Sequence, residues 1–163
     1  MNLETYKSIR NNLIGTCLVA VSKKHNVEKI MALYNEGHRD FGENFIQELV
    51  EKKEQLPKDI NWHFLGNIQT NKIKLIAQHS SLIQSVGRTK VYNHLLKTGL
   101  EKEIKILLQL KLGQEDTKSG LTEKEIIRII EHHPKDSNVK VYGLMGITEN
   151  NISETERAVQ FDQ

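Results

Sequence analysis

The sequence has only one cysteine, Cys17, so no disulfide can form within the chain, and a reducing compartment, the cytoplasm by default, is expected. No apolar run approaches the length of a transmembrane helix, and the amino terminus lacks the apolar core of a signal peptide. Aromatic residues make up only 6% of the chain, and the net charge of +2 comes from interspersed lysines and acids. With no basic stripe, nucleic-acid binding has little support, and we expect neither a nucleic-acid nor a membrane partner.

Several motifs that carry chemistry are also missing. The sequence contains no glycine-rich dinucleotide fingerprint and no P-loop. Its seven histidines lack the spacing of metal ligands, so no metal site is predicted. Ser22 has no evident histidine and acid partners, which argues against a hydrolase triad. The common classes of nucleotide-binding, metal-dependent and serine-dependent proteins are therefore not favoured.

The sequence does contain a regular alternation of apolar runs and amphipathic stretches. The helix signals include two capping boxes, Thr122 with Glu125 and Ser153 with Glu156. Cys17 lies inside the first apolar run and is interpreted as a small buried hydrophobic residue. We predict strands near 17–21, 38–42, 61–66, 82–86, 104–110 and 139–145, and helices near 2–14, 27–36, 43–55, 70–78, 89–97, 122–132 and 153–163.

Six strand–helix alternations predict parallel strands joined by right-handed helical crossovers in one α/β domain over residues 1–163. Two architectures fit this pattern. One is an open, doubly wound sheet, and the other is a (β/α) barrel, which normally needs eight units and about 250 residues. Six units are too few to close such a barrel.

The first apolar run ends at Lys23 and suits a strand that is buried on both faces. Because side chains alternate along a strand, Val19, Val21 and Lys23 share one face. If that face points into a barrel, Lys23 lies at the rim of its interior. A desolvated lysine loses its proton more easily, and the neutral amine attacks aldehydes. The alternative is an ordinary solvated lysine, which is the commoner case on position alone.

Polar and glycine residues follow the other strands, and in either architecture they gather beyond the carboxyl ends of the strands. Each also has a simple structural explanation. Gly42 and Gly66 ease tight turns, and Glu43 and Asn44 cap a helix. Their joint placement around Lys23 favours a shared pocket. The residues in question lie at 41–44, 66–72, 87–88, 113–120 and 145–148.

Six segments, in this order, carry a resemblance that covers the chain from about Leu3 to Phe161. They are 18–23 (LVAVSK), 41–44 (FGEN), 62–66 (WHFLG), 69–72 (QTNK), 115–120 (EDTKSG) and 143–146 (GLMG). They resemble the successive motifs of the pyridoxal phosphate homeostasis proteins, which are similar to the amino-terminal domain of alanine racemase. The resemblance implies a (β/α) barrel of the alanine racemase N-terminal type, with about six of the eight units present.

The same resemblance implies a pyridoxal 5'-phosphate (PLP) site. Lys23 would hold the cofactor aldehyde as an internal aldimine, a Schiff base. Asn44 would lie near the ring hydroxyl, and the end of the third strand would help to enclose the ring together with Met145. Lys72 and Lys118 are motif positions whose role stays open. The implied cofactor-binding residues are Lys23, Asn44, Phe64, Leu65, Gly66 and Met145, with no catalytic residue among them.

The implied function is non-enzymatic PLP binding in vitamin B6 and amino-acid homeostasis, with release of the cofactor to competing amines. Full-length members of the family are expected to be monomers. One alternative is a PLP-dependent, racemase-like enzyme, which needs a second acid/base group opposite the lysine. Tyr92, Tyr142 and His63 are the candidates for that group. Another alternative is a binding module without a cofactor.

Family members continue through a seventh and an eighth strand. There, a Ser/Gly-rich loop and the glycine and threonine of an Arg-Ile-Gly-Thr-like segment grip the phosphate. The sequence stops at Gln163, so the resemblance implies that these units are missing, because the chain is a fragment or a natural short form. If the 163 residues are the whole molecule, we expect weak PLP binding and self-association or poor stability, since a strand edge and the apolar interior would be exposed.

Overall fold

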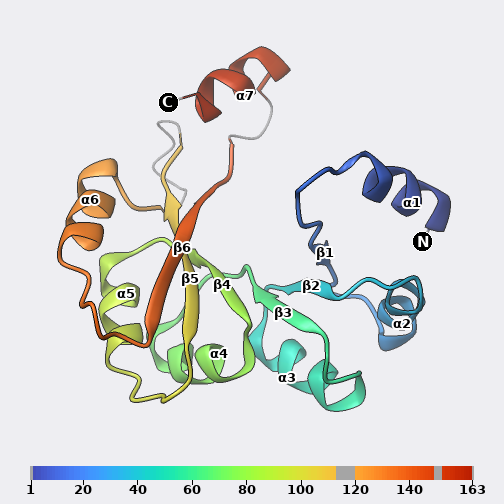
Figure 1. Ribbon diagram of the computed structural model, residues 1–163, viewed down its shortest axis with the longest axis horizontal. Helices are drawn as coiled ribbons and strands as arrows, with labels where there is room; N and C mark the ends of the chain where they lie inside the picture. The colour runs from blue at the N-terminus through green and yellow to red at the C-terminus, as the bar shows by residue number, and fades with distance from the viewer. Residues whose placement is uncertain (1, 113–119, 149–151, 163) are drawn as a thin grey trace.

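The computed structural model describes residues 2–112, 120–148 and 152–162. They form an α/β structure in which a layer of helices covers one sheet (Figure 1). Strands and helices alternate along the described chain. The elements are α1 (Leu3–Asn12), β1 (Ala20–Val21), α2 (Val27–Asn35), β2 (Asp40–Glu43), α3 (Ile46–Gln55), β3 (Asn61–Phe64), the 3-10 turn η1 (Thr70–Lys72), α4 (Ile73–His79), β4 (Leu82–Val86), α5 (Thr89–Leu96), β5 (Ile104–Leu110), α6 (Glu123–Glu131), β6 (Val139–Gly146) and α7 (Glu154–Phe161).

The six strands form one parallel sheet in the order β1-β2-β3-β4-β5-β6. Each crossover therefore moves one strand further in the same direction. Because such crossovers are right-handed, the connecting helices fall on one face of the sheet. Figure 1 shows α2 to α6 along the outer side of a curved sheet. A doubly wound sheet would reverse its strand order, so the structure selects the partial (β/α) barrel, with β1 and β6 as its edges.

The hydrophobic core lies between the sheet and this outer layer of helices. Phe41 of β2 pairs in register with Trp62 of β3, and Ile83 of β4 pairs with Ile106 of β5. All four side chains are at most 1% exposed. Partners in register share a face, so the aromatic and β-branched residues of the strands build the outward side of the sheet.

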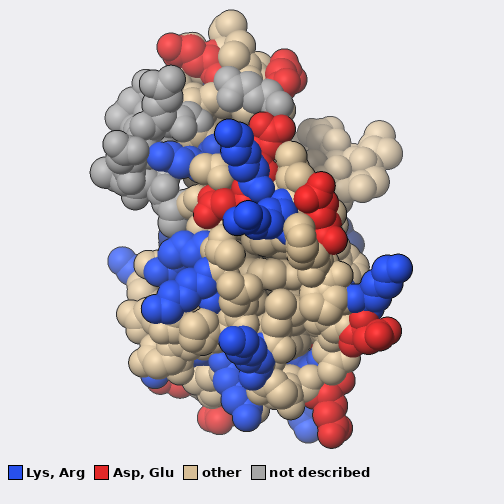
Figure 2. Space-filling model, turned by 90° about the vertical axis from the view of Figure 1, so that its left-hand side faces the viewer, with Lys and Arg blue, Asp and Glu red and all other residues tan. Residues whose placement is uncertain are grey.

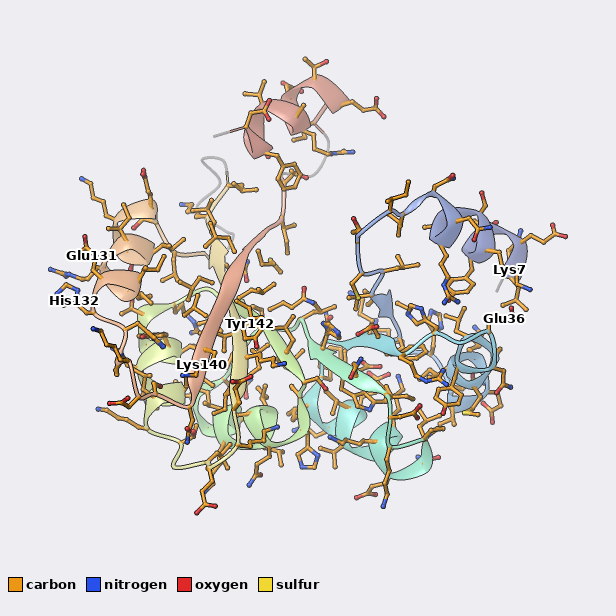
Figure 3. The ribbon with its side chains drawn as sticks, in the orientation of Figure 1. Lys7, Glu36, Glu131, His132, Lys140 and Tyr142 are labelled. Atoms are coloured by element: carbon orange, nitrogen blue, oxygen red, sulfur yellow. The ribbon has the colours of Figure 1, made fainter. Side chains whose placement is uncertain are left out.

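Helix α1 is tied to the end of α2 and the start of β2. Lys7 forms an ion pair with Glu36 at 2.8 Å, and these two side chains point toward each other in Figure 3. Tyr6 is buried, and its hydroxyl lies 3.1 Å from Nδ1 of His38. Helix α7, by contrast, has no buried residue.

Two sequence predictions are wrong at the first strand. The regular strand covers only Ala20 and Val21, Val21 is 46% exposed, and Cys17 is exposed rather than buried. The reason is that β1 is an edge strand, paired with β2 alone. Within the described sheet, no strand lies along its other flank to cover an apolar run.

The third helix also begins later than predicted. Glu43 belongs to β2 and is fully buried. Helix α3 starts at Ile46, and its N-cap residue is Phe45, whose side chain makes no capping hydrogen bond. Glu43 and Asn44 are therefore not helix caps. Glu43 extends the strand because its carboxylate has an ion-pair partner, Lys52, inside the protein.

The face that presents α6 carries charges of both signs around an uncharged central area (Figure 2). This face thus shows no stripe of one sign, in keeping with the interspersed charges of the sequence. None of the helices in the described ranges has the length and apolar character that a bilayer-spanning segment needs.

Candidate functional site

The carboxyl ends of β1 to β4 stay hydrogen-bonded to one another beyond the regular strands. The backbone N–H of Ser22 donates to the carbonyl of Gly42 at 2.9 Å, and that of Leu65 donates to Glu43 at 2.8 Å. Further along, the hydroxyl of Ser85 donates to the carbonyl of Gly66 at 2.6 Å. The residues that follow these strands therefore lie side by side along one edge of the sheet.

Lys23 follows β1 at this edge, and its side chain is exposed. The neighbouring Ser22 faces the helix layer, because its hydroxyl donates to Oε1 of Glu43 at 2.7 Å. Lys23 comes next, in a turn that the N–H of His25 closes by donating to the carbonyl of Ser22 at 3.0 Å. The concave face is the opposite side of the sheet, on which a Cβ added at Gly42 would lie 3.3 Å from Val19. An exposed primary amine at the carboxyl edge of the sheet is within reach of a ligand.

Asn44 and Gly66 are adjacent at the same edge. A Cβ on Gly66 would lie 1.9 Å from the carbonyl oxygen of Asn44, so only glycine permits this approach. Asn44 also lines a cavity of about 200 Å³ at the start of α3, together with Phe64 and Lys72. The predicted residue Asn44 therefore lies next to the predicted residue Gly66, and the cavity that it lines is at the start of α3.

Phe64 points away from the concave face. It pairs in register with the buried Glu43 and is 1% exposed, so its ring belongs to the core beneath the helices. Leu65, the next residue, takes the opposite side, where it would contact a Cβ at Gly42. Of the predicted strand end, Leu65 faces the concave side, Gly66 lies against the backbone of Asn44, and Phe64 packs on the helix side.

A second cavity of about 120 Å³ lies at the ends of β3, β4 and β5. Leu65 and Gly66 contribute to it, and Met145 of β6 pairs in register with one of its lining residues, Gln109. Sequence reasoning missed Ser85 and Gln109. The available signal was polar residues inside mostly apolar strands, Gln84 and Ser85 in LIQSV and Gln109 in ILLQL. The lining residues are Leu65, Gly66, Asn67, Ser85, Gly87, Arg88, Gln109 and Ile147.

The structure does not gather all the predicted residues into one cavity. Lys23 follows β1 and Met145 lies in β6, the two opposite edge strands, and neither residue lines the cavities above. Lys118 and the rest of the segment 113–119 lie outside the described residues. Within the described ranges, no group of three or more histidine, cysteine, aspartate or glutamate residues is placed to hold a metal ion.

The three candidate acid/base residues lie elsewhere. Tyr92 is buried on α5, where its hydroxyl lies 2.7 Å from His133 and burial raises the pKa of the phenol. His63 contacts Asp40, the first residue of β2, at 3.2 Å. Tyr142, labelled on β6 in Figure 3, donates to Glu103, which precedes β5, at 3.3 Å. The last two are engaged with groups at the amino ends of the strands, opposite the edge that carries Lys23.

A sequentially ordered parallel sheet with a lysine after its first strand defines a protein of the partial (β/α) barrel class. Residues 2–163 match the family described as alanine racemase, N-terminal domain. The chain belongs to this family and, within it, to the pyridoxal phosphate homeostasis proteins. One such protein, from Synechocystis sp., is 36% identical, with 96% of this chain and 76% of the relative covered. The relative from Vibrio alginolyticus is 38% identical over 82% of this chain.

Solved structures agree with this placement. PipY of Synechococcus elongatus, without PLP, superposes with a TM-score of 0.90 at 30% identity and covers 97% of this chain and 76% of PipY. Alanine racemase from E. faecalis shares the fold, with a TM-score of 0.76 at 16% identity over 96% of this chain and 44% of the racemase. The chain spans 60% of the length of the Vibrio relative and 56% of that from Schizosaccharomyces pombe.

Proposed function

We propose that this protein binds PLP through Lys23 and acts in vitamin B6 homeostasis as a cofactor carrier that catalyses no reaction of its own. Relatives at 32–38% identity are named pyridoxal phosphate homeostasis proteins, and PipY, at 30% identity and a TM-score of 0.87, has been solved with PLP bound. The observation that carries the proposal is the exposed amine of Lys23 at the carboxyl edge of the same fold.

The chemistry of the residues at this edge fits such a ligand. When bound, PLP supplies an aldehyde that amines attack reversibly. Lys23 offers the primary amine, and Leu65 offers an apolar side chain on the concave face beside Gly42. Asn44 and Gln109 add amide groups that can donate and accept hydrogen bonds. Met145, in register with Gln109, would approach the ligand from β6.

A carrier role accords with what surrounds Lys23. Its side chain is exposed, so a competing amine can reach it. A racemase needs a second acid/base group on the far side of the cofactor. Among the described residues, Tyr92 is buried in the helix layer, and His63 and Tyr142 contact groups at the amino ends of the strands. We therefore favour the carrier over the enzyme. A reducing compartment, the cytoplasm, is in keeping with the free, exposed thiol of Cys17.

The sixth strand bears on the oligomeric state. Leu144 of β6 is 54% exposed and Ile147, which follows it, is 51% exposed. Strand β6 pairs with β5 alone in the described sheet. We therefore expect the isolated 163-residue domain to self-associate. Sedimentation velocity measures this directly, and a stable monomer would count against it.

The test is a titration of the protein with PLP, followed by visible absorbance. We expect saturable binding that is lost in Lys23→Ala and kept in Lys74→Ala, which removes an exposed lysine of α4 far along the chain. The PLP-loaded protein is then assayed for racemisation of alanine. Equal binding by Lys23→Ala would refute the site, and racemisation that depends on Lys23 would favour the enzyme.

A further inference from the structure

A buried ammonium lies directly behind the lysine of the proposed site. Lys52 projects from α3, and its side chain is 7% exposed. Its Nζ donates to the carbonyl of Ser22 at 2.7 Å, to Oε1 of Glu43 at 2.6 Å and to Oε1 of Glu48 at 2.7 Å. A lysine ammonium has three N–H donors, so these acceptors use all of them.

This cluster holds the residue before Lys23. Ser22 is 4% exposed, and its backbone N–H, hydroxyl and carbonyl are all hydrogen-bonded. Its backbone N–H donates to Gly42, its hydroxyl donates to Glu43, and its carbonyl accepts from Lys52. Position 22 is therefore fixed through its backbone and its side chain together.

The same cluster holds the residue after Lys23. The backbone N–H of Lys24 donates to Oε1 of Glu48 at 2.6 Å, the carboxylate oxygen that also accepts from Lys52. Lys24 has a φ of 61°, in the left-handed region that residues with a Cβ disfavour. Such a conformation persists only where its surroundings impose it. Two contacts accompany it here, the bond from the N–H of Lys24 to Glu48 and the turn that the N–H of His25 closes on the carbonyl of Ser22 at 3.0 Å.

We propose that Glu43, Glu48 and Lys52 are positioning residues for Lys23. None of them is expected to touch a ligand, because the cluster lies on the helix side of the sheet, with Glu43 and Lys52 buried, while the side chain of Lys23 is exposed. They clamp the backbone on both sides of Lys23 and so fix the direction of its amine. The inference rests on the proposed function of Lys23.

The composition of the cluster fits this role better than a role in stability. Buried charges pay a large desolvation cost, and well-packed apolar residues often serve stability as well or better. Hydrogen bonds to charged groups, however, define direction and distance. Lys52 and Glu48 bond the backbone at Ser22 and Lys24, and Glu43 bonds the hydroxyl of Ser22, so together they are suited to orient this segment.

The test uses the full chain and the rate at which PLP is captured, with the band position of the bound chromophore as a second readout. In Glu48→Ala, the N–H of Lys24 loses its acceptor, and we expect capture to slow by about tenfold. Glu48→Gln keeps an acceptor for that N–H and should recover most of the rate. The side chain of Glu48 is 23% exposed, so both variants should fold, which circular dichroism checks.

Glu51→Ala is the matched control, because Glu51 is an exposed acid of the same helix. It should capture PLP at the wild-type rate. Ser22→Ala removes the hydroxyl bond to Glu43 from the other side and should also slow capture. Wild-type rates and band positions in both Glu48→Ala and Ser22→Ala would overturn the positioning role and leave the proposed function of Lys23 standing. If the wild-type chain itself captures no PLP on Lys23, the proposed function fails instead.

Discussion

Gly66 lies so close to Asn44 that a Cβ at position 66 would sit 1.9 Å from the carbonyl oxygen of Asn44 and 2.8 Å from its Cα. The obstacle is backbone, which cannot rotate aside as a side chain can. Gly66→Ala should therefore destabilise the protein by about 3 kcal/mol, at the upper end of what overpacking costs. Urea unfolding measures the change.

Gly87→Ala provides the comparison, because the nearest atom to its added Cβ is 3.3 Å away, at Gly120. Only a small adjustment is needed there, so the loss should be clearly smaller than for Gly66→Ala. Equal losses in the two variants would mean that the approach of Gly66 to Asn44 is not what requires glycine.

The ion cluster allows a test of stability that is separate from PLP binding. Lys52→Met leaves the fully buried Glu43 without its cation, and such an uncompensated charge costs about 3–5 kcal/mol. Adding Glu43→Gln removes the second charge, so the double variant should recover part of the loss. Lys53→Met, which removes one hydrogen bond to the carbonyl of His79, should cost only about 1 kcal/mol. Additive effects of Lys52→Met and Glu43→Gln in a double-mutant cycle would contradict the pairing.

The lowered pKa of His38 allows a prediction of how the free energy of unfolding depends on pH. Burial is the largest cause that lowers the pKa of His38 below its ordinary 6.5, and Arg10 and Arg39 add to the effect. Its Nε2 lies 2.7 Å from the carbonyl of Asp40, so the neutral ring donates there and accepts from Tyr6 at Nδ1.

The unfolded chain therefore binds the proton more readily than the folded one. Unfolding free energy should fall as the pH decreases from about 6.5 to the lower pKa of the folded state. Burial, with Lys53 and Lys102 nearby, lowers the pKa of His79 in the same way. Urea midpoints at several pH values should show a shallower slope in His38→Gln and a still shallower slope in His38→Gln/His79→Gln. An unchanged slope in the double variant would contradict this assignment.

Local patterns in the sequence were sufficient for the interior of the fold. The strands predicted at 82–86 and 104–110 have those bounds in β4 and β5, because each is a central strand with neighbours on both sides. Both predicted capping boxes, at Thr122 and Ser153, are present. Periodicity and capping depend on residues close in sequence, so both can be predicted from the sequence alone.

The candidate site depends on contacts between residues far apart in sequence, and there prediction fell short. The run after Cys17 looked like a buried strand because its apolar composition does not reveal that β1 is an edge. Glu43 looked like a helix cap because its partner Lys52 is nine residues away. The resemblance implied that Phe64 belongs to the strand end that helps to enclose the ring, and its register with the buried Glu43 places its side chain toward the helices.

The measurement that tests the account most directly is a map of where PLP attaches. The protein is mixed with PLP, reduced with borohydride, digested and analysed by mass spectrometry, with Lys23→Ala in parallel. We expect one labelled peptide, which carries Lys23, and we expect it to be absent from the variant. Label spread over many lysines, or a label that is unchanged in Lys23→Ala, would contradict the central claim that the carboxyl edge of this sheet presents Lys23 as the cofactor-binding amine.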